Sequence, residues 1–161
     1  YKVYRLREWS GKLGPKLKEG DRQVPEGFYY VSASRMRPET PHFLGVDLGF
    51  PNEYDTYHSR TGSGSLIHGG KNDSGAFILS SSDMSEVYAL SDAALQSGQR
   101  LFRVNVFPFR MTDKRMEQEW KKQPERIDFW MNLKEGYDFF ENANFPPDVS
   151  VNAGEYAYRF P

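Results

Sequence analysis

Residues 60–79 read RTGSGSLIHGGKNDSGAFIL and contain two short apolar runs separated by a polar loop. The runs, 65–68 and 77–79, have the length and composition of strands. The loop between them is rich in Gly, Ser, Asn and Asp, the residue types that turns prefer. The segment therefore predicts a strand ending near His68, a loop, and a second strand beginning after Ala76.

Strand-like alternation extends outward on both sides of this segment. Further strands are predicted at 1–6, 28–31, 42–48, 102–106 and 156–160. Residues 49–64 are rich in Gly, Pro, Asn, Asp and Ser and predict one long connection. A loop of that length inside a compact domain is usually functional or mobile.

Three helices are predicted in the second half of the chain. The clearest begins near Asp83, which can cap it, and ends at Gly98. Two more, at about 113–122 and about 125–141, are separated at Pro124. The order is mainly strands, then helices, then a strand, which indicates an α+β fold rather than a doubly wound sheet.

The composition is that of one globular domain spanning residues 1–161. Hydrophobic residues make up 38% and charged residues 27% of the 161 residues, and the net charge is −1. This balance gives no electrostatic case for nucleic acid as a partner. Because the chain starts at Tyr1 without Met or an apolar signal segment, we expect a trimmed N-terminus.

The chain contains no cysteine, which excludes disulfides and thiolate metal sites. No cluster of His, Asp and Glu has the spacing of metal ligands, so neither a metal nor a cofactor is predicted.

Two catalytic or binding motifs fit the 60–79 segment poorly. Gly64 and Gly69 have the spacing of the outer glycines of a P-loop, but Gly70 stands where that loop requires Lys. The run 73–76, Asp-Ser-Gly-Ala, resembles an aspartic protease motif, but it follows a polar dipeptide and has no second copy. We reject the first motif, and the second is a weak match.

The same segment resembles the catalytic domain of the L,D-transpeptidase (YkuD) family, in particular its YafK-like branch. The family shows a strand ending in His-Gly, a short loop, and Ser-x-Gly-Cys opening the next strand. In that branch the cysteine follows the histidine by eight residues, which from His68 leads to position 76. Other stretches that are similar to the branch lie at 11–16, 19–27, 50–55, 60–63, 108–112 and 133–137.

The resemblance implies a β-rich catalytic core with packed helices and no cofactor. It implies a peptidoglycan-processing cysteine enzyme that acts on diaminopimelate-containing stem peptides through a thioester acyl-enzyme. His68 would be the general base, with backbone N–H groups around Gly69, Gly75 and position 76 contacting the oxyanion. The location would be periplasmic. The acyl acceptor could be water or a stem-peptide amine, and a wall-attached lipoprotein or outer-membrane protein could be acceptor or leaving group.

Ala76 departs from the family at the nucleophile position, and no other cysteine replaces it. The chain is therefore predicted to bind without turnover, either as an engineered Cys-to-Ala variant or as a natural pseudoenzyme. The other motif residues, His68-Gly69 and Ser74-Gly75, are retained, which favours the engineered change because a pseudoenzyme has no need to keep them. The alternatives to a transpeptidase parent are a peptidoglycan-binding scaffold and an L,D-carboxypeptidase, in which water is the acceptor.

Four residues are candidates for substrate binding. Arg60 and Arg110 could bind stem-peptide carboxylates by bidentate hydrogen bonds, although structural salt bridges are equally expected. Ser63 could hydrogen-bond near the base, and Ser74 could orient the substrate or cap the loop. More ordinary structural roles are expected elsewhere: turn stabilisation for Asn52 and Asp55, and satisfied structural histidines at His42 and His58.

Overall fold

A five-stranded sheet forms one layer of the computed structural model, which describes residues 2–71 and 75–160. Its strand order is β1-β6-β5-β4-β3. The strands are β1 (Glu8–Trp9), β3 (Met36–Arg37), β4 (Gly45–Asp47), β5 (Leu66–Gly69) and β6 (Phe77–Leu79). β5 and β6 are parallel although only residues 70–76 connect them, and the other neighbours are antiparallel. Parallel neighbours usually need a connection of about a dozen residues or more, so this is an unusually short one.

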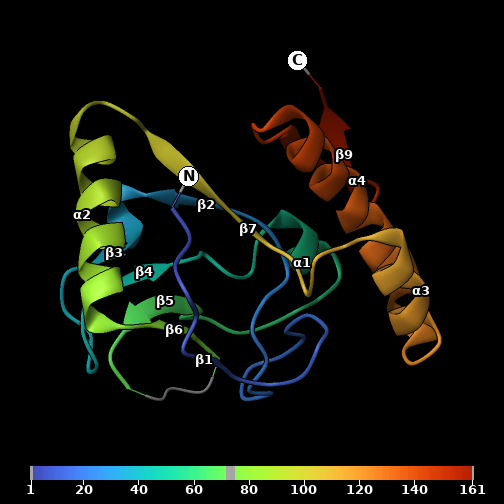
Figure 1. Cartoon of the computed structure of the whole chain (residues 1–161), viewed down its shortest axis with the longest axis horizontal. Helices are drawn as coiled ribbons and strands as arrows, with labels where there is room; N and C mark the ends of the chain where they lie inside the picture. Colours follow the sequence, from blue (N-terminus) through green and yellow to red (C-terminus); the bar gives the residue numbers. More distant parts are fainter. Residues whose placement is uncertain (1, 72–74, 161) are drawn as a thin grey trace.

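A second layer is a two-stranded antiparallel sheet of β2 (Gly27–Ser32) and β7 (Leu101–Val106). Successive residues of β2 point to opposite faces. Tyr29 and Val31 pack toward the five-stranded sheet, whereas Phe28 packs toward the C-terminal helices. The β2–β7 pair therefore lies between the five-stranded sheet and the C-terminal part of the chain (Figure 1).

Helices α1, α2 and α3 begin after residues whose side chains accept backbone hydrogen bonds. Asn52 caps α1 (Glu53–Tyr57), Ser80 caps α2 (Ser81–Gln96) and Thr112 caps α3 (Asp113–Trp120). The short 3-10 segments are η1 (Ala33–Arg35) and η2 (Pro124–Arg126). The fourth helix, α4 (Ile127–Ala143), follows Pro124 as predicted and leads to a C-terminal hairpin, β8 (Asp148–Asn152) and β9 (Glu155–Arg159).

The α+β prediction is confirmed, with four local corrections. The strand expected at 1–6 is wrong, because the first strand is the short β1. The cap of α2 is Ser80 rather than Asp83, whose backbone N–H is the donor to the Ser80 hydroxyl. The 49–64 connection contains helix α1, and strand β8 was not anticipated.

No helix in the described part of the chain combines the length and the apolar character that crossing a membrane requires.

Candidate active site

His68 lies in β5, and Ala76 directly precedes the neighbouring strand β6. The β5–β6 register pairs His68 with Ile78. Continuing that register back along β6 puts Ala76 level with Leu66, and the alternation of side chains puts Ala76 on the same face as Ile78 and His68. A diagonal step of this kind separates Cα atoms by about 7–8 Å, which an imidazole can span toward a longer side chain at position 76.

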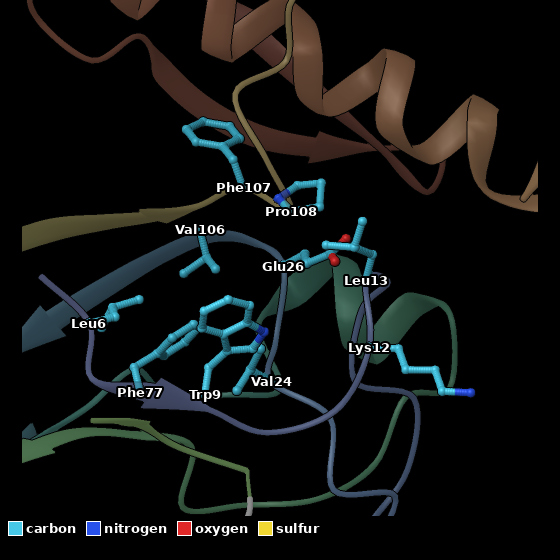
Figure 2. Close-up of a pocket in the computed structure, with 10 residues that line it drawn as sticks. All are labelled: Leu6, Trp9, Lys12, Leu13, Val24, Glu26, Phe77, Val106, Phe107 and Pro108. Atoms are coloured by element: carbon cyan, nitrogen blue, oxygen red, sulfur yellow. The ribbon is translucent and has the colours of Figure 1, made fainter. Parts of the chain in front are cut away.

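This face points away from the β2–β7 layer. Phe77, between Ala76 and Ile78, packs with the core cluster that includes Tyr29 and Leu48. It also lines an apolar hollow of about 160 Å³ below β7, which Figure 2 shows. Because neighbouring residues alternate, that hollow lies on the opposite face from the His68 ring and belongs to a different part of the molecule.

The His68 ring has a defined orientation. Its Nδ1 lies 2.9 Å from the carbonyl oxygen of Gly69, and the ring stacks on His42 with centroids 5.1 Å apart and planes inclined by 19°. A carbonyl oxygen only accepts hydrogen bonds, so in the neutral ring Nδ1 carries the proton. Nε2 is then the nitrogen with a lone pair, which is the state that a general base needs.

Both candidate catalytic positions are buried. His68 is 0% and Ala76 is 1% exposed. A substrate carbonyl could therefore reach either position only after neighbouring groups move.

Glycine is required at the two glycine positions of the predicted site for different structural reasons. A Cβ on Gly69 would lie 2.8 Å from the Phe43 ring and 2.9 Å from the Met84 Cβ, so glycine lets β5 approach α2 closely. Gly75 has φ +94°, which favours glycine, whereas the nearest atom to an added Cβ is 3.8 Å away. Close packing is thus the requirement for glycine at position 69, and backbone conformation is the requirement at position 75.

The N–H groups of these glycines already have acceptors. Gly69 donates to the Leu44 carbonyl at 3.1 Å as part of the sheet. Gly75 donates to the hydroxyl of Ser10. An oxyanion contact from Gly69 would cost a sheet hydrogen bond, so position 76 is the better placed donor.

The structure brings Ser63 close to Gly75. Both line a polar hollow of about 180 Å³, together with Lys16, Glu19, Gly20, Arg22, Gly64 and Ser65. The Ser63 N–H donates to Glu19 at 3.0 Å, and its side chain is exposed. Ser74 lies outside the described residues, as does Asp73 of the weak aspartic protease match.

Arg60 lies in a buried polar network rather than beside His68. Its guanidinium contacts the Asp55 carboxylate at 2.9 Å and lies over the rings of Tyr54 and Phe129, with 9% of the residue exposed. This geometry favours the structural salt bridge over a substrate contact.

The same carboxylate organises α1. Asp55 accepts from the Tyr29 hydroxyl at 2.9 Å and from the Asn52 N–H at 3.1 Å, while Asn52 caps the helix in return. Burial raises the pKa of the Tyr29 phenol, and the neighbouring Asp55 charge raises it further, so Tyr29 remains a donor. Asn52 and Asp55 therefore stabilise the 49–64 connection, as their sequence suggested.

Arg110 and His58 lie apart from the His68 ring. Arg110 follows β7, is exposed, and lowers the pKa of Tyr137 in α4, although burial raises that pKa more strongly. His58 contacts the Gly154 carbonyl at 2.7 Å and packs on Tyr54, which agrees with a structural histidine. A substrate role for Arg110 stays a prediction.

Sequence reasoning did not find Ser10 or the stacking partner His42. Ser10 is 65 residues from Gly75, and no local pattern links a lone serine to so distant a loop. His42 was placed among the ordinary histidines because it lies outside the motif, yet its ring covers that of His68.

No family model matches the chain. It is 38% identical over 158 residues to "Putative L,D-transpeptidase YafK" from two strains of Escherichia coli. The match covers 98% of this chain but 63% of each relative, so the chain spans less than two thirds of their length. Among solved structures, the helical cell shape determining protein Pgp2 from Campylobacter jejuni is 15% identical with a TM-score of 0.46, covering 89% of this chain and 62% of its own.

Proposed function

We propose that this chain, as a member of the same family as the "Putative L,D-transpeptidase YafK", binds diaminopimelate-containing stem peptides of peptidoglycan. We further propose that position 76 is where the parent enzyme carries its nucleophile. In the chain as it stands, Ala76 leaves binding without turnover.

One observation carries the proposal. His68 is oriented with Nδ1 toward a carbonyl and lies on the same face of β5 and β6 as position 76. A base that is held by one nitrogen and a nucleophile position on the next strand form the minimal arrangement for thiol activation.

This arrangement is compatible with the parent chemistry that the family resemblance implies. With cysteine at position 76, His68 Nε2 accepts the thiol proton and the sulfur attacks the amide carbonyl at the L-centre of diaminopimelate. The backbone N–H of position 76 stabilises the oxyanion. The tetrahedral intermediate collapses to a thioester as the C–N bond breaks, and the leaving amine takes the proton from His68. Water or an amine then attacks the thioester, and the choice between them decides between carboxypeptidase and transpeptidase.

Alanine provides neither a thiol nor another nucleophilic atom. Its burial at 1% exposure favours a second candidate function, a peptidoglycan-binding scaffold whose closed centre has no catalytic task. A periplasmic location is part of the proposal for both functions, because their substrate is peptidoglycan. A wall-attached lipoprotein or outer-membrane protein is part of the proposal only as an acyl acceptor or leaving group.

The decisive experiment is Ala76→Cys. This variant should release product from tetrapeptide muropeptides, because it supplies the missing sulfur beside an oriented base. Adding His68→Ala should lower that activity by about 10²–10⁴-fold. Product would be followed by chromatography and mass spectrometry.

Thiolate absorbance gives an independent readout, since Ala76→Cys would contain the chain's single thiol. The pKa of a thiol at position 76 should lie below that of Ala33→Cys, an exposed control position, and should rise when His68 is replaced. If Ala76→Cys folds, shows an ordinary thiol pKa and processes no muropeptide, the assignment of this site fails. If that variant still bound muropeptides, the scaffold function would remain as the explanation.

A further inference from the structure

A groove of about 590 Å³ separates α3 from α4, on a part of the molecule remote from β5 and β6 (Figure 1). One face of each helix lines it. The α3 residues recur at the spacing of a single helical face, and the α4 residues do the same. The lining residues are Asp113, Met116, Glu117 and Trp120 from α3, and Ile127, Asp128, Met131, Lys134, Glu135 and Asp138 from α4.

The floor of the groove is apolar and partly open. Met116 is buried at its base, whereas Trp120 is 55% and Met131 is 52% exposed. Trp is the residue type most often found as an energetic anchor of an interface. Met is flexible and polarizable, and it is typical of surfaces that adapt to different apolar partners.

The rims of the groove are acidic. Five carboxylates and one amine line it, which gives −5 + 1 = −4, whereas the whole chain has a net charge of −1. The basic residues of α3 do not line the groove. Glu117 pairs with Lys121 at 2.8 Å, at the end of the same helix. The other four carboxylates of the groove still outnumber its one amine.

The single lysine does not neutralise this surface. Lys134 is shared by Asp113, at 3.1 Å, and Asp138. Asp128 and Glu135 form no ion pair with any residue in the described part of the chain, all of α3 and α4 included. An incoming cation could pair with both without breaking an existing contact.

We propose that this groove is a docking site for a basic amphipathic segment of a partner protein. Apolar side chains of that segment would pack on Met116, Trp120 and Met131, and its Lys or Arg side chains would pair with Asp128 and Glu135. An amphipathic helix seats its apolar face in a groove of this kind, with anchors at i, i+3, i+4 and i+7. The inference is independent of the chemistry at position 76.

The probe for this proposal is a synthetic amphipathic helical peptide with Leu on one face and Lys on the other. Calorimetry should detect binding at low salt that weakens as salt is raised. The matched peptide with Glu in place of Lys should not bind. Asp128→Lys combined with Glu135→Lys should weaken binding of the Lys peptide at least about tenfold.

A matched charge control is Glu39→Lys combined with Glu155→Lys, which makes the same change in net charge at exposed positions outside the groove. This control should bind the Lys peptide nearly as well as the unmodified chain. NMR shifts should be confined to α3 and α4, with the Trp120 indole among them.

Three results would overturn the proposal. One is equal affinity for the Lys and Glu peptides, and another is equal loss of affinity in the groove variant and the control variant. The third is self-association of the chain that the groove variant abolishes, because the groove would then be the interface between two copies.

Discussion

Arg60 and His68 are close in sequence and belong to the same motif-bearing segment, but they lie in different kinds of surroundings. Arg60 joins a network in which carboxylate, phenol, amide and guanidinium groups contact one another. The His68 ring is held by one carbonyl on Nδ1 and by stacking on His42.

The difference separates a polar residue that stabilises the fold from one that could take part in a reaction. Every contact of the Arg60 guanidinium is explained by the fold, so removing a partner should damage stability first. The His68 contacts fix the orientation of the ring and leave Nε2 as its basic nitrogen. The contacts of His68 therefore agree with a base that is held in one orientation, whereas those of Arg60 agree with a structural role.

The largest expected effect is at the Arg60 network. Asp55→Ala should lower the free energy of unfolding by about 3–5 kcal/mol, because it leaves the buried Arg60 guanidinium without its carboxylate. Urea denaturation followed by circular dichroism measures this change. As a control, Asp148→Ala removes a carboxylate whose ion pairs are exposed and should change stability little. A loss below about 1 kcal/mol for Asp55→Ala would end the distinction between the two regions.

Arg110 extends the comparison to an arginine whose side chain is exposed. Arg110→Ala should weaken muropeptide binding by about 1.5–3 kcal/mol if its guanidinium pairs with a substrate carboxylate. Stability should change by less than about 0.5 kcal/mol, because the side chain is exposed. Calorimetry and denaturation on the same samples separate the two quantities. Unfolding of the variant with normal binding by its folded fraction would make Arg110 structural as well.

The two glycines of the candidate site test how tightly it is packed. Gly69→Ala should destabilise by about 1–3 kcal/mol through overpacking, since the Met84 Cβ and the Ser81 backbone cannot yield easily. Gly75→Ala should cost about 1–2 kcal/mol from its positive φ alone. Thermal unfolding of both variants shows which substitution destabilises the protein more. A larger loss at Gly75 than at Gly69 would mean that the loop conformation, not the β5–α2 contact, limits the site.

Ser63→Ala should have the smallest effect. If the Ser63 hydroxyl contacts bound substrate, affinity should fall by about 0.5–1.5 kcal/mol. The contact between the Ser63 N–H and Glu19 is retained in the variant, so the fold should not respond. Muropeptide affinity that is unchanged within error would assign Ser63 to turn chemistry.

Local signals in the sequence predicted the elements that are self-contained. The apolar run 77–79 became β6, the predicted strand 28–31 became β2 with one more residue at each end, and Pro124 separated two helices, because each pattern reports on its own backbone. The first strand was misplaced because residues 2–6, the described part of that run, belong to no strand. The pairing with β6 is made by Glu8 and Trp9, with a backbone hydrogen bond from Arg7 to Ile78. Strand pairing is a tertiary property that alternation alone does not contain.

In the candidate site, too, some features could be predicted from local sequence and others depend on tertiary structure. The proximity of His68 and position 76 could be predicted because they lie in one continuous motif, whereas their catalytic roles stay predictions. The direction of β5 relative to β6, which puts position 76 level with Leu66 rather than His68, required the structure. The Ser10 contact and the burial of Arg60 also required it, since both depend on segments that are distant in the chain or in the fold.

The short connection between β5 and β6 also has a consequence for the order of folding. Paired residues in β5 and β6 are ten positions apart, as in Ile67 and Phe77, whereas Val31 of β2 pairs with Phe102 of β7. Closing a shorter loop costs less chain entropy, and local contacts generally form faster than distant ones. The two strands that carry His68 and position 76 should therefore gain protection from hydrogen exchange before β2 and β7 have paired.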